Sequence, residues 1–377
     1  MMMAQGPSES RTLGMARRSA GQDLARLGAA PVHRGSKGHC RSSGRHVRVA
    51  HLLDDFALGG ITKSFAVFRE PILAQAFASE IRQVQPAWQL APRLDADVIV
   101  THFTPNWQKL AYVASLRLRN PRARLVHVEH SYADAWEELM VPDRRRFRLM
   151  MRLWMKAFDA VCGVSEEQAR WVQRVASLPS GSVRVIRPWS GRQGLDRVAD
   201  LTVDRARPLV LGAYGRLAYA KGFDVLIEAV KMLDNRRFSL VIGGYGPEEE
   251  ALKRQAAGHA NIRFVGTVTN LPDFMAGCHV VVVPSRWEAF GLAASEAKLA
   301  GRPIVTSAVD GLPEQVGAAG VVADCGNAEA LACILRLLPR MELAEMGRAG
   351  RASLDNAETE RAEAWLALMH SLLPPTH

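Results

Sequence analysis

Two cations and two glutamates in the second half of the chain are the strongest candidates for a binding or catalytic site. Arg216 and Lys221 lie in the stretch GRLAYAKG, in a turn between an apolar strand and an amphipathic helix. In a parallel α/β sheet this turn lies at the carboxyl ends of the strands, where ligands bind. Two cations there can clamp a diphosphate and stabilise it as it departs. The alternative, for an isolated arginine and lysine, is that both are solvated loop cations that bind no ligand.

The two glutamates lie in PSRWEAFGLAASEAKLAGRPIV, around the start of a second expected helix. The backbone of Phe290, Gly291 and Leu292 opens this helix, and its free N–H groups with their partial positive charge suit phosphate oxygens. Ionised carboxylates accept hydrogen bonds from neighbouring hydroxyls, so Glu288 and Glu296 suit a sugar and a ribose. Each glutamate taken alone could equally be a solvated or dipole-stabilising acid.

These loops need a scaffold, and the pattern of apolar runs predicts one. From Val47 onward, short apolar runs end in polar or Gly-rich turns, each followed by a helix-length segment. This alternation is typical of parallel α/β sheets, so we expect two doubly wound Rossmann-like domains. The expected strands are 47–53, 97–101, 124–128, 160–164 and 183–186, then 209–214, 238–242, 262–265, 280–283, 303–306 and 321–322.

Composition predicts the division of the 377 residues. Much of the net charge of +10 comes from the N-terminus, which is rich in Gly, Ser and Arg and has no apolar periodicity, as in disordered segments. The expected division is a disordered basic tail over 1–46, an acceptor-side domain over 47–190, a linker over 191–207, a donor domain over 208–355 and a helix over 356–377 that braces the first domain.

Five motifs, in order, resemble retaining GT-B glycosyltransferases of family four, the glycosyl transferases of group 1. They are GRLAYAKG, IGGYGP, FVGTV, EAFGLAASE with its paired glutamates, and GLPE. The match is close over about 210–320 and looser over 47–187. The resemblance implies a GT-B fold, in which two Rossmann-like domains face a cleft, and a nucleoside-diphosphate sugar donor. Uridine is the first expectation for the base and guanosine the second.

The resemblance also implies a role for each matching residue. Glu288 would lie near the transferred sugar as a binder and electrostatic stabiliser, Glu296 would hold the ribose, and Arg216 and Lys221 would bind the diphosphate. Backbone N–H groups for the phosphates would come from Phe290, Gly291 and Leu292, and the edge against the nucleobase from Gly266, Thr267 and Val268. Gly59 and Gly60 would form a Gly-rich turn over the phosphates. His130 would face the sugar.

Two departures from the family pattern concern the acceptor side. The segment between Leu53 and Asp97 is short for a full set of elements, and the four residues 187–190, Arg-Pro-Trp-Ser, stand where the family usually has a Pro-Asn-Gly turn. The acceptor class therefore stays open. The pair Asp95 and Asp97 precedes its strand instead of following it, so no metal is expected there, and no cofactor is expected elsewhere.

The basic run from Arg144 to Lys156 is interleaved with apolar residues, which indicates a helix with one cationic face and one apolar face. It could pack its apolar side on the sheet and leave a solvated cationic face, or it could lie on an anionic membrane surface. No stretch of about 18 apolar residues occurs. The five cysteines lack metal-ligand spacing, which indicates reduced thiols in a cytoplasmic protein, peripheral at most to the inner face of a membrane.

The expected function is transfer of a hexose-like sugar from a nucleoside diphosphate to a hydroxyl of a glycan or lipid-linked acceptor. Retention of anomeric configuration comes from the resemblance. Two alternatives stay open: a nucleotide-sugar epimerase of the same fold, and a catalytically silent GT-B partner subunit. Nucleic-acid binding is not expected, because aromatic residues are only 7% of the chain and do not follow a basic groove.

Overall fold

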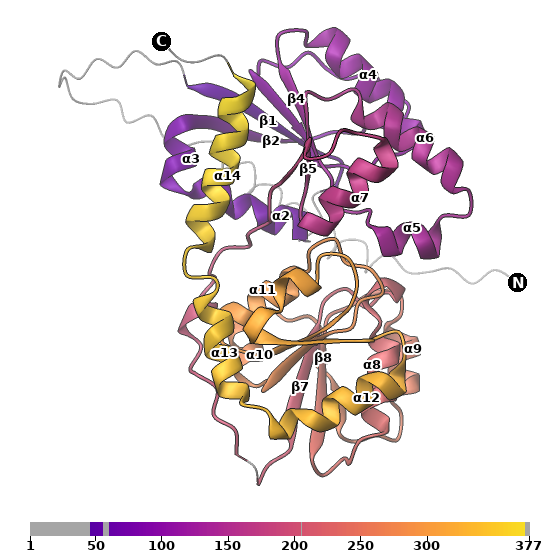
Figure 1. Cartoon of the computed structure of the whole chain (residues 1–377), viewed down its shortest axis with the longest axis vertical. Coiled ribbons are helices and arrows are strands. Elements are labelled where there is room, and N and C mark those ends of the chain that lie inside the picture. The colour runs from indigo at the N-terminus through magenta and orange to yellow at the C-terminus, as the bar shows by residue number, and fades with distance from the viewer. Residues whose placement is uncertain (1–45, 56–59, 205, 374–377) are drawn as a thin grey trace, which may run out of the picture.

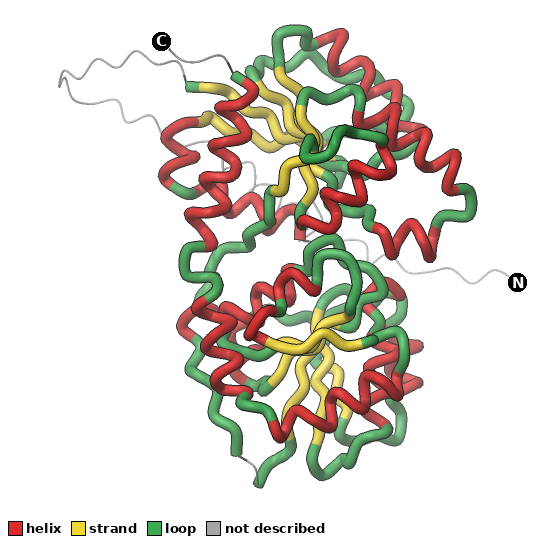
Figure 2. Tube along the Cα trace, in the orientation of Figure 1, coloured by secondary structure: helices red, strands yellow, loops and turns green. Residues whose placement is uncertain are grey.

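The computed structural model describes residues 46–55, 60–204 and 206–373 (Figure 1). Two sheets, each with helices around it, lie one above the other in this view, and Figure 2 shows their strands as two separate groups. The expected basic tail, apart from its last residue, and Gly59 of the Gly-rich turn lie outside the described residues.

The first sheet has six parallel strands in the order β2-β1-β3-β4-β5-β6. Every neighbouring pair is parallel, as the alternating pattern predicts. The strands are β1 (Val47–Leu53), β2 (Phe77–Gln83), β3 (Val98–Thr101), β4 (Arg124–Val128), β5 (Ala160–Gly163) and β6 (Val183–Val185).

One strand of this sheet was not expected. β2 pairs with β1 along its whole length, from Val47 opposite Phe77 to Leu53 opposite Gln83. It is an edge strand, and only Phe77 of its seven residues is buried. Such a strand carries no apolar run for sequence analysis to detect, so the short first-half segment holds more structure than its pattern indicates.

Helices and 3-10 turns connect these strands. Their bounds are α2 (Gly60–Ser64), η2 (Phe65–Arg69), α3 (Pro71–Ala76), η3 (Trp107–Lys109), α4 (Leu110–Arg119), α5 (Asp134–Met140), α6 (Arg144–Met155) and α7 (Glu166–Ala176). Ser165 caps α7 by accepting a hydrogen bond from the backbone N–H of Gln168 at 3.2 Å, as its position before a helical pattern predicts.

The second sheet also has six parallel strands, in the order β12-β11-β10-β7-β8-β9. This order places β7 and β10 side by side at the centre. The loops after both strands therefore emerge at the same edge of the sheet. The strands are β7 (Leu209–Tyr214), β8 (Phe238–Gly243), β9 (Ile262–Phe264), β10 (Val280–Val283), β11 (Ile304–Ser307) and β12 (Gly320–Ala323).

The connections of the second half end in a long C-terminal helix. They are η4 (Leu195–Arg197), η5 (Tyr219–Lys221), α8 (Phe223–Lys231), α9 (Glu249–Gln255), α10 (Leu271–Ala276), α11 (Leu292–Leu299), η6 (Pro313–Gln315), η7 (Gly317–Ala319), α12 (Ala328–Leu337), η8 (Leu338–Arg340), α13 (Leu343–Ala352) and α14 (Ala357–Leu372).

The helix α14 packs against α3 and η2 of the first half (Figure 1). The Trp365 ring lies 4.9 Å from the Phe68 ring, centroid to centroid, and Trp365 belongs to the apolar cluster that also contains Val100 of β3. Burial of a large aromatic side chain supplies stability of about 2–3 kcal/mol. The chain thus crosses back to its first half after the second sheet is complete, while the exact domain boundaries stay predictions.

Candidate active site

The helix α11 begins at a glycine whose backbone only glycine adopts easily. Gly291 has φ of 88°, and a Cβ atom there would lie 2.5 Å from the side chain of Leu312. No side chain in the described part of the chain caps this end of the helix, so its first N–H groups stay available to an anion. The side-chain amide of Gln315 donates to the carbonyls of Phe290 and Gly291, which fixes the approach to the helix.

Glu296 lies one turn into α11 and is 3% exposed. The Tyr214 hydroxyl donates to its Oε2 at 2.5 Å, and the Lys63 Nζ lies 3.4 Å from its Oε1. Burial and the Glu296 carboxylate raise the pKa of Tyr214 well above its usual range, so this hydroxyl stays a donor. Sequence analysis missed both partners, although Tyr214 ends β7 and Lys63 follows the Gly-rich turn.

Glu288, from the loop before α11, forms an ion pair with Lys221 from η5. The Ser285 hydroxyl donates to the same carboxylate oxygen at 3.2 Å. The backbone N–H of Glu288 donates to Oδ2 of Asp310 at 2.9 Å. The two residues expected at the sugar and at the diphosphate are therefore in direct contact, and their position is held from three sides.

The cation loop approaches the glutamate loop closely. Gly222 has φ of 62°, and a Cβ atom there would lie 2.0 Å from the Pro284 carbonyl oxygen, so only glycine fits. This contact brings Lys221 beside Glu288. Arg216, in the same loop, is exposed and has no hydrogen bond or ion pair to the described part of the chain. A free guanidinium at the rim of the site can turn toward a phosphate.

The stretch expected at the nucleobase follows β9. Gly266 has φ of 66°, and the space beside its Cα is open. Its carbonyl accepts a hydrogen bond from the Gly244 N–H at 2.6 Å, which ties the loop to the turn after β8. Thr267 is exposed, and Val268 packs against Gly243. The loop therefore lies at the same sheet edge as the loops after β7 and β10, where phosphate binding is expected.

The first half of the chain also contributes to this site. Gly60 opens α2, and a Cβ atom there would lie 3.3 Å from Cδ1 of Leu292, the first residue of α11. Figure 1 shows α2 and α7 on the side of the first half that faces α11. The Gly-rich turn and the helix expected to bind phosphate therefore meet, together with Lys63.

Two further carboxylates join the halves of the chain. Asp310 accepts a hydrogen bond from the Ala135 N–H at 3.0 Å as well as from Glu288, and burial raises its pKa. Glu314 of the GLPE motif accepts from the N–H groups of Glu166 and Glu167 at 3.0 and 2.7 Å, where the helix dipole of α7 favours negative charge. The loops around Glu288 are thus anchored to the first half.

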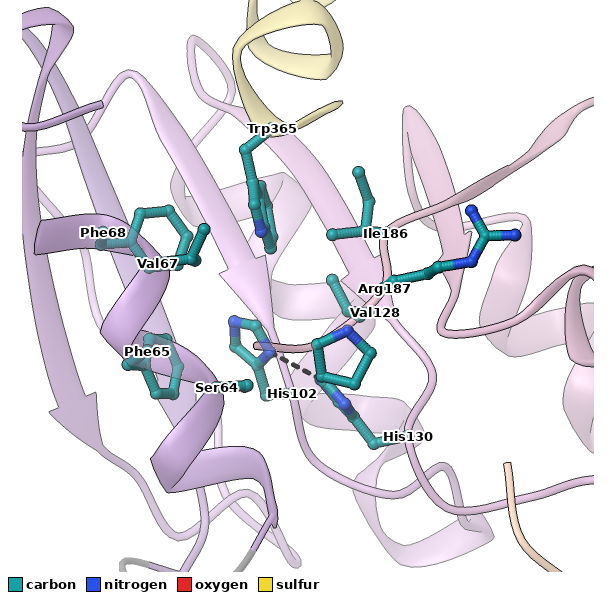
Figure 3. Close-up of a pocket in the computed structure, with 11 residues that line it drawn as sticks. Ser64, Phe65, Val67, Phe68, His102, Val128, His130, Ile186, Arg187 and Trp365 are labelled. Atoms are coloured by element: carbon teal, nitrogen blue, oxygen red, sulfur yellow. Dashed lines mark hydrogen bonds between the residues drawn. The ribbon is translucent and has the colours of Figure 1, made fainter. Parts of the chain in front are cut away.

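His130 ends a chain of three histidine rings. Its Nε2 lies 3.0 Å from Nδ1 of His102, and Figure 3 shows these two rings. Nε2 of His102 lies 3.0 Å from Nδ1 of His51. Burial lowers the pKa of His130 to about 4 and that of His51 to about 3. Burial and the neighbouring rings also lower the pKa of His102. All three rings are therefore neutral at pH 7.

The aspartate pair near β3 is engaged with Arg48. Asp95 forms an ion pair with its guanidinium, and Asp97 accepts from its backbone N–H at 2.9 Å. Within the described ranges, no group of three or more His, Cys, Asp or Glu side chains is arranged to hold a metal ion. Every helix in those ranges is also too short or too polar to cross a bilayer.

Two family models match the chain, one on each half. The model described as Glycosyltransferase Family 4 matches residues 45–189, and the model described as Glycosyl transferases group 1 matches residues 208–339. The chain belongs to the group 1 glycosyltransferases of family 4. The resemblance drawn from the five motifs is thereby confirmed, and the two models together extend it over both halves.

Relatives and solved structures agree with this family. The chain is 30% identical to a D-inositol 3-phosphate glycosyltransferase of Xylanimonas cellulosilytica over 74% of its own length, and 33% identical to a glycogen synthase of Thermus thermophilus over 45%. It covers only 66% and 38% of those relatives. The Anabaena protein HepE, solved with UDP-glucose, matches 87% of this chain and all of its own with a TM-score of 0.67 at 20% identity. This likeness confirms the expected GT-B fold.

Proposed function

We propose that the chain transfers a hexose-like sugar from a nucleoside diphosphate, UDP before GDP, to a hydroxyl of a glycan or lipid-linked acceptor with retention. The observation that carries the proposal is the contact between Lys221 and Glu288 beside the uncapped end of α11. A diphosphate that binds to Lys221 and to the N–H groups at the start of α11 has its attached sugar next to Glu288. The HepE structure with UDP-glucose supports uridine as the first choice.

In the transfer step, the bond between the anomeric carbon and the diphosphate oxygen breaks, and its electron pair stays on the diphosphate. Lys221, Arg216 and the N–H groups of α11 stabilise the charge that develops there, at about 2–4 kcal/mol for each group. The Glu288 carboxylate stabilises the positive charge on the sugar ring. The acceptor oxygen bonds to the anomeric carbon, and its proton goes to the departing diphosphate.

Glu296 binds the ribose in this proposal. One of its oxygens accepts from the Tyr214 hydroxyl and the other lies 3.4 Å from Lys63, so the carboxylate is oriented before the donor arrives. A ribose hydroxyl then joins a preorganised acceptor, which reduces the entropy lost on binding. Gly266, Thr267 and Val268 form the edge against the base.

His130 binds a sugar hydroxyl through its ring in this proposal. The neutral ring carries one N–H and one acceptor nitrogen, and its Nε2 is already bonded to His102. His130 therefore offers Nδ1 to the sugar as a single hydrogen-bonding atom of fixed direction. Gly60 leaves room for the donor where α2 meets α11, and Gly59 falls outside the described residues.

Between a glycan and a lipid-linked acceptor, the helix α6 favours the lipid-linked one. The protein would then be peripheral to the inner face of a membrane. Met150, Met151 and Trp154 bury one side of the helix. The opposite side exposes arginines together with Leu149 and Leu153, whose side chains are 50% and 48% exposed. Cations beside exposed leucines suit an anionic lipid surface. Sedimentation with vesicles of anionic phospholipid tests this choice, with Leu149→Ser and Leu153→Ser reducing the bound fraction.

A panel of nucleotide sugars tests the central proposal. Purified protein is incubated with UDP-, GDP- and ADP-sugars, and diphosphate release is followed with and without added glycan or lipid acceptors. Release from one donor identifies base and sugar, and the anomer of the product reports retention. Conversion of the donor to its epimer without transfer would favour the epimerase instead. No turnover and no nucleotide binding would favour the silent partner subunit.

A further inference from the structure

A pocket of about 260 Å³ lies between α11, α14 and the segment after β6. Phe290, which was predicted at the donor site, lines this pocket, as do Gln315 and Glu314, which hold the loops around that site. The pocket lining contains three cations from three different parts of the chain, Arg187, Lys298 and Arg361. None of them has a role in the proposed transfer.

Two of these cations are buried without an acidic partner. Lys298 and Arg361 are each 7% exposed. Among the residues that the structure describes, Lys298 donates only to the Gln315 carbonyl at 2.9 Å, and Arg361 donates only to the carbonyls of Pro188 and Ala357. Within the described residues, no carboxylate oxygen lies within 4 Å of either charge. A buried charge is normally paired, because removal from water costs several kcal/mol.

The electrostatics show an excess of positive charge in this pocket. Burial, with repulsion from Arg361, lowers the pKa of Lys298 to about 8. Burial also lowers the pKa of Arg361 to about 10, and Arg187 adds to this effect while Glu360 opposes it. Arg361 therefore repels both Lys298 and Arg187 beside a pocket of about 260 Å³, which is large enough for an anion.

Within the described residues, carboxylates pair with Arg187 but not with the two buried cations. Glu314 accepts from two N–H groups at the start of α7 and lies 3.7 Å from Arg187. Arg187 also pairs with Glu166 at 3.1 Å. Glu360 is exposed to solvent. Among the described residues, Lys298 and Arg361 are therefore bonded to carbonyl oxygens and to no carboxylate.

The segment 187–190, which departs from the family pattern, borders the pocket. Arg187 lines the pocket, and the Pro188 carbonyl accepts from Nε of Arg361 at 3.2 Å. The Trp189 ring lies 5.0 Å from the Arg361 guanidinium, and its Nε1 donates to Glu358 at 3.1 Å. The unusual segment thus supplies one cation and fixes the direction of another.

We propose that this pocket binds a small phosphate-bearing anion through Lys298, Arg361 and Arg187. A phosphate accepts hydrogen bonds from an ammonium and two guanidinium groups at once, which suits its tetrahedral oxygens. The volume also leaves room for the organic part of a phosphomonoester. Inorganic phosphate and a phosphomonoester share this chemistry. The site does not depend on the proposed transfer, because none of its cations binds the donor.

Calorimetric titration with inorganic phosphate and with glycerol phosphate tests the site. The full chain is compared with an R216A/K221A variant, in which the cations of the donor site are missing. We expect anion binding to remain in that variant, and to weaken about tenfold or more in Lys298→Met. Lys253→Met, on the exposed side of α9, is the matched control and should bind like the unaltered protein.

Arg361→Lys gives a second variant that keeps the charge but loses the guanidinium, and thermal melting verifies that each variant folds. Tighter binding of glycerol phosphate would assign the pocket to a phosphomonoester, and tighter binding of inorganic phosphate would assign it to the free ion. The proposal is overturned if Lys298→Met binds both probes normally, if R216A/K221A abolishes binding, or if neither probe binds the unaltered protein. Failure of sugar transfer with normal anion binding would count against the proposed function only.

Discussion

The Nδ1 atom of His102 lies 3.0 Å from the Nε2 atom of His130, and the other nitrogen of His102 lies 3.0 Å from Nδ1 of His51. A neutral imidazole has one donor and one acceptor nitrogen, so the position of the proton on one ring determines its position on the next. His51 ends the chain, because its Nε2 has no partner among the described residues. Two buried rings therefore determine whether the free nitrogen of His130 acts as a hydrogen-bond donor or as an acceptor.

His102→Phe should lower kcat by about fivefold to tenfold and leave nucleoside-diphosphate affinity within about twofold. The ring hydrogen bond that orients His130 contributes about 1 kcal/mol, and it acts on the sugar, not on the diphosphate. His102→Asn retains a polar group near the Nδ1 position and should lose less. Steady-state kinetics and nucleotide titration measure both effects. Equal losses in the two variants would mean that His102 serves packing alone.

The stability of the protein should fall as the pH falls below about 6.5. Burial lowers the pKa of His51 to about 3, so the folded ring stays neutral while the unfolded ring takes up a proton below its ordinary pKa of 6.5. Stabilisation by neutral His51 is full above pH 6.5 and is lost toward pH 3. The loss is about 1.4 kcal/mol per pH unit.

Urea unfolding at pH 7.5, 6.5, 5.5 and 4.5 measures this dependence. His51→Asn should be less stable at pH 7.5 but show a shallower loss between pH 6.5 and 4.5, because one titrating group is gone. The comparison uses slopes, so the packing damage at His51 does not affect it. Parallel curves for the two proteins would rule out His51 as a source of the acid sensitivity.

Arg216→Ala and Lys221→Ala should each reduce turnover by about 10²–10³, because each cation stabilises the charge on the departing diphosphate. Their effects on folding should differ. Arg216 is exposed and unpaired within the described residues, so its loss should leave the melting temperature unchanged, whereas Lys221→Ala removes the ion-pair partner of Glu288. Lys231→Ala on α8 is the control. Turnover like that of the unaltered protein in both variants would remove the diphosphate assignment.

The two glutamates should separate kinetically. Glu296→Gln should raise the donor KM more than it lowers kcat, because a ribose contact is made in the ground state and the transition state alike. Glu288→Gln should lower kcat while nucleoside-diphosphate affinity stays near that of the unaltered protein. Because Glu296 is buried against Tyr214, melting curves should accompany the kinetics. The reverse pattern would show that the donor lies the other way round in the site.

The fold class and the loops of the candidate site could be predicted from local sequence pattern. Apolar runs such as 280–283 and 209–214 are short and are bounded by turn residues, so their strand character follows from that pattern. The motifs around Glu288 and Lys221 could be found because turns and helix starts require particular residues nearby. Ser165 as a helix cap follows from the same local rules.

The contacts between residues far apart in the sequence depend on the folded structure. Tyr214 and Lys63 reach Glu296 from 82 and 233 positions away, and no periodicity encodes such a contact. The edge strand β2 escaped detection because its stability comes from pairing with β1 rather than from its own apolar content. Lys298 and Arg361 likewise resemble ordinary helix surface cations in sequence. They become buried because α14 returns to the first half of the chain, and burial in a shared pocket is a property of packing, which local sequence does not determine.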